Sequence, residues 1–424
     1  MKLGFARKDI TPDFPVPLAG YMKDRISQGV HDKLYARALF FDDAERGPVV
    51  LLQLDLLCLD RLCLEKIYKG LQGGVPDKSR ILVCSTHTHS GFGGIFDMEQ
   101  GINQELLPLL GQSNPALIDL VSERSIEVIS EAAKNCVETT VRINRGSIDG
   151  LGTNRRRKEI PCDNSLFMME FQRADGKRIL LYNLCCHPTV LNGDNRLLSA
   201  DFPGAVAEKL EGTPETYDLV IFINGSAGDM STRFTRRESS FAECSRYAGI
   251  IIKAIENTRK GEFIPLEKAE LRYHSLSLRR TEKPDLHQAR ENLHMAMENM
   301  KELKNKNADP AAIRKAVSLI EGAQMNLLKA GQEKSDKTTE NIIVETGILI
   351  INETFIVCSP LELFSSLAML LKKEKTLECF GYINCLSGYL ADCDAWDNLD
   401  YEALSGDFAR GEGERYIELV RALV

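Results

Sequence analysis

Short runs of consecutive apolar residues alternate along this chain with longer segments in which apolar residues recur every three or four positions. Residues 49–57 and 80–85 are short apolar runs and are predicted strands, and residues 61–71 between them are a predicted helix. A strand, a helix and a second strand in this order are typical of a βαβ unit, whose two strands run parallel. This part of the chain is therefore predicted to be an α/β fold.

The same alternation continues towards the C-terminus. Residues 114–134 form a predicted helix, with Asn114 as its N-cap and Pro115 in the first helical position. Further strands are predicted at 141–144, 166–171, 179–186 and within 342–358, and further helices at 205–210 and 243–258. We therefore expect an α/β fold with a mixed central β-sheet flanked by helices.

Residues 284–333 differ from the rest, because apolar residues recur there at helical spacing in two stretches separated by a turn at 305–310. We predict a two-helix hairpin inserted into one domain that spans residues 1–424. Its role stays open between simple packing and a wall or lid for an apolar substrate. The second interpretation rests on methionines, which adapt to irregular shapes: Met295, Met297, Met300 and Met325.

Composition narrows the range of partners. The chain has 424 residues, 43% of them hydrophobic and 27% charged, with a net charge of −8 and no broad basic stripe, so nucleic acid is not an expected partner. The N-terminus lacks the apolar region of a secretory signal, and no apolar run reaches the roughly 18 residues of a membrane span. Twelve scattered cysteines without a Cys-x-x-Cys pair favour a reducing, cytoplasmic location.

Polar residues follow three of the predicted strands. His87 and His89 follow the second strand, His187 follows a later one, and the apolar run 219–223 leads into the loop that contains Ser231. Ligands collect beyond the carboxyl ends of strands in open α/β sheets, so these loops are expected to form one active site. Neutral imidazole is a good zinc ligand, although each histidine taken alone also fits an ordinary polar residue.

The chain resembles the catalytic N-terminal domain of the neutral/alkaline non-lysosomal ceramidase family, and the similarity extends from the N-terminus to the end. The segments that carry it are Ile-Thr-Pro at 10–12, Ala-Gly-Tyr at 19–21, Gln-Gly-Val-His at 28–31, Thr-His-Thr-His-Ser-Gly at 86–91, Asn-Arg at 154–155, Cys-His-Pro-Thr at 186–189, Gly-Asp-Met-Ser at 228–231, Pro-Leu-Glu at 360–362, Asn-Cys-Leu-Ser-Gly-Tyr at 384–389 and Tyr-Glu at 401–402. Thr232 stands where the family has proline and Leu361 where it has glycine. The C-terminal immunoglobulin-like domain of those enzymes is not expected after Val424.

The resemblance implies a zinc site. Its ligands would be His87, His187, Glu362 and Tyr389, with one position left for water. Two imidazoles and a carboxylate with an open position are typical of catalytic rather than structural zinc. Zinc in such a site lowers the pKa of bound water to about 7 and polarises a carbonyl group, which suits hydrolysis of an amide.

Other residues are expected to act on the substrate: the resemblance implies this for Arg155 and Tyr401, and for His89 it follows from its position beside the metal motif, where it cannot easily share one tetrahedral shell with His87. His89 is expected to transfer a proton, and Arg155 and Tyr401 to hold the carbonyl oxygen or the oxyanion that develops from it. Ser231 is either a nucleophile or a group that orients the amide. Asp229 is expected to fix the loop rather than to react.

The leading prediction is a zinc-dependent amidohydrolase that cleaves a small-molecule or lipid N-acyl compound, with a ceramide-like lipid as one candidate. One alternative is a zinc esterase or amidase that acts on a smaller polar substrate. Another is a non-catalytic binding protein on the same fold. All four metal positions and Ser231 keep the expected residue types, which favours an enzyme.

Overall fold

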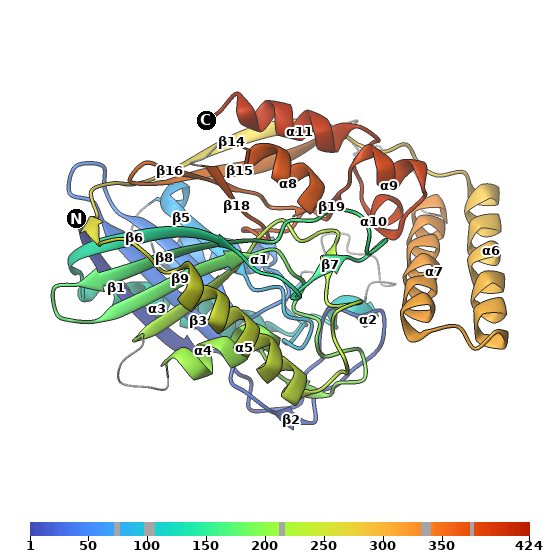
Figure 1. Cartoon of the computed structure of the whole chain (residues 1–424), viewed down its shortest axis with the longest axis horizontal. Coiled ribbons are helices and arrows are strands. Elements are labelled where there is room, and N and C mark those ends of the chain that lie inside the picture. Colours follow the sequence, from blue (N-terminus) through green and yellow to red (C-terminus); the bar gives the residue numbers. More distant parts are fainter. Residues whose placement is uncertain (72–76, 97–106, 212–216, 332–340, 374–376) are drawn as a thin grey trace.

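The computed structural model describes residues 1–71, 77–96, 107–211, 217–331, 341–373 and 377–424 (Figure 1). Within them a first β-sheet contains nine strands: β1 (Lys2–Asp9), β3 (Tyr35–Asp42), β4 (Val49–Leu54), β5 (Ile81–Ser85), β6 (Val137–Ser147), β8 (Ser165–Arg173), β9 (Arg178–Leu184), β11 (Leu219–Asn224) and β13 (Ile264–Pro265). The order is β11-β9-β8-β6-β1-β3-β4-β5, and β13 pairs with β6. Only the pairs β4/β5 and β9/β11 are parallel, so the sheet is mixed as predicted.

A second sheet packs on the first; the strands predicted within 342–358 form its middle, but the sequence did not predict that they belong to a separate sheet. Its strands lie in the order β14 (Ala269–Arg279), β15 (Asn341–Ile351), β16 (Thr354–Cys358) and β18 (Leu377–Phe380), with β16 and β18 parallel. Buried side chains from both sheets form one hydrophobic cluster, in which Leu51 and Phe167 of the first sheet meet Leu349 of the second. The core therefore lies largely between two sheets.

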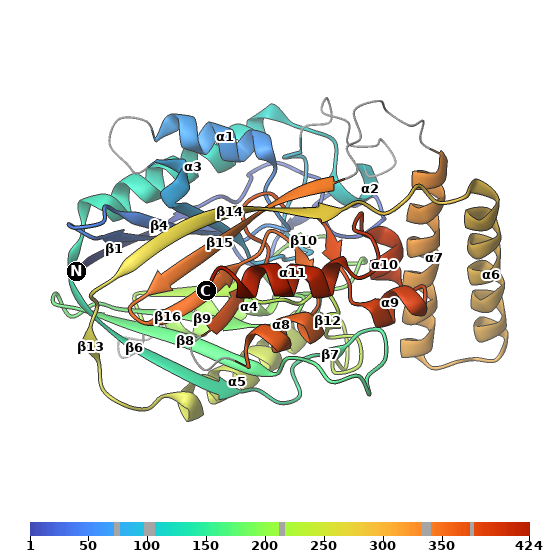
Figure 2. The same cartoon turned by 90° about the horizontal axis from the view of Figure 1, so that it is seen from above.

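Helices cover the outer faces of both sheets (Figure 2). On the first sheet α1 (Arg61–Gly70) and α3 (Pro115–Lys134) pack over one half, and α4 (Asp201–Glu211) and α5 (Phe241–Thr258) over the other. On the second sheet α8 (Ser365–Leu371) and α11 (Glu412–Arg421) do the same. The molecule thus has four layers, and the predicted flanking helices are confirmed.

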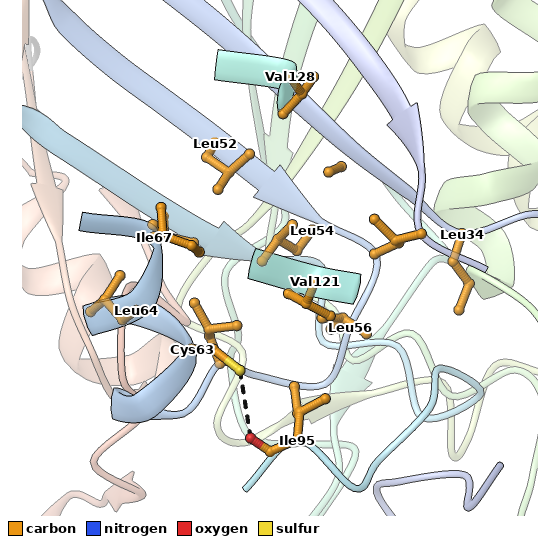
Figure 3. Close-up of a cluster of buried hydrophobic side chains, with 14 of the residues drawn as sticks. Leu34, Leu52, Leu54, Leu56, Cys63, Leu64, Ile67, Ile95, Val121 and Val128 are labelled. Carbon is orange, nitrogen blue, oxygen red and sulfur yellow. Dashed lines mark hydrogen bonds between the residues drawn. The ribbon is translucent and has the colours of Figure 1, made fainter. Parts of the chain in front are cut away.

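Figure 3 shows how α1 and α3 attach to the sheet. Leu52 and Leu54 of β4 point between Ile67 of α1 and Val121 of α3, all of them buried. Complete burial of one such side chain stabilises the fold by about 1.5–3 kcal/mol. The start of α3 matches the prediction, since the Asn114 side chain accepts a hydrogen bond from the backbone of Ala116.

Several short elements lie where the strands end. They are the two-residue pairs β2 (Gly29–Val30) with β10 (Leu197–Leu198), β7 (Thr153–Asn154) with β12 (Met230–Ser231) and β17 (Glu362–Leu363) with β19 (Tyr389–Leu390), and the helices α2 (Leu107–Leu110), α9 (Cys393–Asp397) and α10 (Tyr401–Ser405). Each parallel strand pair is joined by a crossover that contains a helix. The loops after β5, β9, β11 and β16 can therefore meet at the carboxyl ends of parallel strands.

Two helices, α6 (Leu286–Asn305) and α7 (Pro310–Gly331), lie between β14 and β15 where the hairpin was predicted, and residues 332–333 of that prediction lie outside the described residues. Both views place α7 between α6 and the rest of the molecule. On α6, Met295 and Met297 are 58% and 50% exposed. Among the described helices, none combines the length and the apolar composition needed to cross a bilayer.

Candidate active site

Two histidines from the first sheet are fixed in the same way. His87 follows β5, and its Nδ1 lies 2.8 Å from the carbonyl oxygen of Leu57. His187 follows β9, and its Nδ1 lies 2.9 Å from the carbonyl oxygen of Met230. A carbonyl oxygen can only accept, so Nδ1 carries the hydrogen in both rings. Each Nε2 therefore presents a lone pair, which is the form of imidazole that ligates a metal.

A carboxylate in β17, just beyond the second sheet, lies close to both imidazoles. Glu362 follows β16, and its Oε2 lies 3.2 Å from Nε2 of His187 and 3.6 Å from Nε2 of His87. In the β17–β19 pair, Glu362 lies directly opposite Tyr389. The structure therefore brings together all four residues that were predicted to hold zinc.

His89 joins the same group. His87, His89 and His187 each offer one ring nitrogen, and these three atoms lie within 4.8 Å of one another. Both ring nitrogens of His89 are buried and have no hydrogen-bond partner among the described residues. A buried polar atom without a partner is costly, so this imidazole fits a position where a metal, a water or a substrate meets it.

Burial sets the charge of these groups. It lowers the pKa of His87 and of His187 to about 3, and that of His89 well below its ordinary value. The rings are therefore neutral near pH 7, as metal ligation requires. Burial also raises the pKa of the Glu362 carboxyl. Neutral imidazoles around one buried carboxylate form a donor set that suits a divalent metal such as zinc.

Arg155 lies beside this group. Its Nε donates a hydrogen bond to Oε1 of Glu402 at 2.6 Å, and its guanidinium carbon lies 5.3 Å from the ring centre of Tyr389 and 5.7 Å from that of Tyr401. The Nη2 atom of Arg155 is buried and has no partner among the described residues. This leaves one cationic donor that can meet a substrate oxygen.

The loop after β11 holds Ser231 at a turn. Its Oγ accepts a hydrogen bond from the backbone N–H of Arg233 at 3.2 Å. The described residues include no hydrogen bond between Ser231 and the three histidines, and the link to them runs through Met230, whose carbonyl oxygen accepts from His187. Asp229 accepts from the Asn154 side chain at 2.8 Å and from the Ser365 backbone at 2.6 Å, which fixes this loop as expected.

The comparison with protein families decides the lineage. The family described as neutral/alkaline non-lysosomal ceramidase, N-terminal, matches residues 1–259. The chain belongs to this family. The matched part includes the three clustered histidines, and Glu362, Tyr389 and Tyr401 lie after it in the sequence.

Individual members of the ceramidase family are distant in sequence. The neutral ceramidase of Drosophila melanogaster is 23% identical over 229 residues, which are 50% of this chain and 32% of that protein. The neutral ceramidase of Mycobacterium tuberculosis (strain ATCC 25618 / H37Rv) is 25% identical over 244 residues, 50% of this chain and 37% of that protein. Each alignment therefore spans about a third of the length of the relative.

The fold is shared with solved ceramidase structures. The crystal structure of neutral ceramidase from Pseudomonas aeruginosa matches with a TM-score of 0.75 and 16% identity over 99% of this chain and 73% of that chain. A ceramidase complexed with C2 matches with the same TM-score and 15% identity, over 99% and 74%. The two sheets are therefore an architecture that this chain shares with ceramidases.

One residue beside the histidines was missed in the sequence. Tyr382 follows β18, its ring centre lies 4.1 Å from that of His87, and its buried hydroxyl has no partner among the described residues. Its φ of 57° turns the backbone into the left-handed region. The only signal in the sequence was its position after an apolar run, which became informative once β18 was known to lie beside β16.

Proposed function

We propose that this protein is a zinc-dependent hydrolase that cleaves the amide bond of an N-acyl compound. The observation that carries the proposal is the pair of imidazoles whose Nε2 atoms lie 3.2 and 3.6 Å from one oxygen of Glu362. Both rings are oriented by backbone carbonyl oxygens, so their lone pairs are directed before any ligand arrives. Membership of the ceramidase family supports the same reaction class.

In this proposal His87, His187, Glu362 and Tyr389 hold the zinc ion. When bound there, zinc would polarise the amide carbonyl and lower the pKa of a bound water to about 7. The two histidines follow strands β5 and β9 of the first sheet, and the other two residues lie opposite each other in the short β17–β19 pair. The complete donor set favours an enzyme over a binding protein that has lost its chemistry.

The residues around this set act on the amide. Nη2 of Arg155 donates to the carbonyl oxygen as negative charge develops there, and one such donor lowers the barrier by about 3–4 kcal/mol. Glu402 orients this guanidinium through its hydrogen bond to Nε. Tyr401 lies beside Arg155 and binds the same oxygen or its neighbour. His89, whose ring nitrogens have no other described partner, takes the proton that the attacking water loses and passes it to the departing amine.

Ser231 has two possible roles in this scheme, as a nucleophile or as a group that orients the amide. Its hydroxyl oxygen accepts from the Arg233 backbone and so remains able to donate its own hydrogen. No described base lies within hydrogen-bond distance of this hydroxyl. The structure therefore favours the orienting role.

The experiment that tests the proposal is the metal content of purified protein, measured for wild type, His187→Ala and the control His294→Ala. His294 is exposed on α6 and far from the site in sequence, so its replacement is expected to leave the metal in place. We expect about one zinc per chain in wild type and in the control, and none in His187→Ala, because the ligand set loses one of two oriented imidazoles. Absence of bound zinc in folded wild type supplied with zinc would overturn the proposal.

A further inference from the structure

Three arginines near the candidate active site have only neutral hydrogen-bond partners. Arg233 follows Ser231, Arg236 lies in the same loop, and Arg314 comes from α7 of the inserted hairpin. The guanidinium of Arg233 donates to the backbone oxygen of Arg155 at 2.8 Å and to Oγ of Ser318 at 2.6 Å. That of Arg236 donates to the backbone oxygens of Thr189 and, at 3.3 Å, of Val190. That of Arg314 donates to the backbone oxygen of Arg233 at 2.7 Å. Within the described part of the chain, none of the three forms an ion pair with a carboxylate.

These hydrogen bonds connect the three arginines to the reacting centre. Arg233 donates to the backbone of Arg155, whose own Nη2 is buried without a described partner. Arg236 donates to the backbone of Thr189, which follows shortly after His187 in the sequence. Arg314 attaches α7 to the same loop, and its Nε is also buried without a described partner. Positive charge therefore extends from the candidate metal site to the hairpin.

The charges of these arginines oppose one another. Burial, together with the positive charges of Arg155 and Arg314, lowers the pKa of Arg233 to about 10. Burial and the charge of Arg236 likewise lower the pKa of Arg314. Three described acids oppose this effect: Glu402, which is bonded to Arg155, and Glu321 of α7 act on Arg233, and Asp309 acts on Arg314. The whole chain carries a net charge of −8, so this concentration of positive charge is a local feature.

We propose that Arg233, Arg236 and Arg314 bind a negatively charged group of the substrate, so that the protein deacylates anionic N-acyl compounds. The inference rests on the proposed amide hydrolysis and adds the class of substrate. Guanidinium groups recognise carboxylate and phosphate oxygens through charge-assisted hydrogen bonds, which are stronger than those to neutral groups. A substrate anion would supply the directly hydrogen-bonded carboxylate or phosphate that these three arginines do not find among the described residues.

The same geometry gives the inserted hairpin a role in specificity. Two hairpin side chains, those of Arg314 and Ser318, form hydrogen bonds with Arg233 in the loop that follows Ser231. The methionines that suggested an apolar lid lie partly on α6, where Met295 and Met297 are exposed. In this inference α7 selects the charge of the substrate.

Two matched substrate pairs test the inference. The first pair is N-octanoylglycine and neutral N-octanoylglycinamide, and the second is N-octanoyl-O-phosphoethanolamine and neutral N-octanoylethanolamine. For each pair, kcat/KM of the anionic member is divided by kcat/KM of the neutral member. Both values are measured from the release of octanoate. We expect wild type to favour one anionic member by about tenfold to a hundredfold, because a hydrogen bond to a charged group contributes about that factor. The pair with the larger ratio shows whether carboxylate or phosphate is the bound group.

Substitutions assign the preference to residues. Arg314→Gln is expected to lower the ratio about tenfold, and Arg314→Lys to restore part of it because the charge is kept. Arg290→Gln is the matched control, since Arg290 is exposed on α6 of the same hairpin. Thermal unfolding followed by circular dichroism checks that each variant is folded. Equal ratios for wild type and Arg314→Gln in both pairs would overturn the inference.

A binding measurement separates this inference from the proposed function. Calorimetric titration of zinc-supplied wild type with N-octanoylglycine, N-octanoyl-O-phosphoethanolamine and their neutral partners requires no turnover. Preferential binding of one anion that is lost in Arg314→Gln would support the arginine site even if no amide is cleaved, and the hydrolase proposal alone would then fail. Hydrolysis of neutral and anionic amides at equal rates, with no binding preference, would instead refute the arginine site alone.

Discussion

Replacement of Asp229 by asparagine tests how the loop that carries Ser231 is held. Asp229 is fully buried and accepts two hydrogen bonds, from Nδ2 of Asn154 at 2.8 Å and from the backbone N–H of Ser365 at 2.6 Å. The side-chain amide of Asn154 cannot exchange its oxygen and nitrogen positions without losing a hydrogen bond, because its Oδ1 already accepts from the backbone N–H of Arg156 at 3.0 Å. An asparagine at position 229 has one side-chain oxygen for the two donors, Nδ2 of Asn154 and the backbone N–H of Ser365. Its NH₂ group must therefore lie against one of these donors.

The expected cost follows from this count. One buried donor loses its acceptor in Asp229→Asn, and a buried donor without a partner costs about 1–3 kcal/mol. Asp229→Ala removes both acceptors, so about 2–6 kcal/mol is expected on the same basis. Since a folded domain is stable by about 5–15 kcal/mol, both changes are measurable. kcat/KM should fall as well, because the same loop supplies the Met230 carbonyl that orients His187.

Urea unfolding at pH 7 measures the stability, with Asp13→Asn as the control. Asp13 is exposed, so its amide variant is expected to unfold within about 0.5 kcal/mol of wild type. The order wild type, Asp229→Asn, Asp229→Ala is expected for decreasing free energy of unfolding. If Asp229→Asn is as stable as the control, the two hydrogen bonds do not hold the loop and the reasoning is refuted.

Three further predictions concern the same site. Burial raises the pKa of Asp229 from 3.8 to about 6, so the contribution of this carboxyl to the free energy of unfolding is complete below about pH 4 and falls by about 3 kcal/mol as pH rises through 6. In urea titrations the difference in free energy of unfolding between wild type and Asp229→Asn should therefore shrink over this pH range, and a constant difference would contradict the prediction. His89→Ala should keep its zinc and lose at least about a hundredfold in kcat; loss of zinc would instead make His89 a ligand. Ser231→Ala should retain more than about a tenth of wild-type activity if Ser231 only orients the amide, whereas a larger loss with an acyl-enzyme burst in wild type would identify a nucleophile.

The local parts of the site were predictable from the sequence. His87 and His187 follow short apolar runs that form β5 and β9, and such strands can be recognised from consecutive residues alone. The cap of α3 and the two hairpin helices were predictable for the same reason. The resemblance to ceramidases supplied Glu362 and Tyr389, which no local pattern marks as metal ligands.

The second sheet could not be predicted in the same way. β14 is partly exposed and alternates in burial, and its partner β15 is separated from it by the whole inserted hairpin. Pairing over such a distance in the sequence depends on tertiary packing and leaves no local pattern. Arg233 was missed for a related reason: a single arginine in a loop is common, and its lack of a carboxylate partner is visible only when its neighbours are known.

The candidate metal ligands come from segments that follow strands of both large sheets, which links metal binding to the stability of the fold. His87 and His187 follow strands β5 and β9 of the first sheet, whereas Glu362 and Tyr389 lie in the β17–β19 pair, beyond β16 and β18 of the second sheet. Apolar side chains pack between the two sheets. A metal ion held by all four residues would connect the segments that follow the two sheets. Separation of the sheets would then require release of the ion, so the resistance of the fold to unfolding should increase with the logarithm of the free metal concentration. Thermal unfolding at several metal concentrations would then show, without any substrate, whether the four ligands hold the ion together.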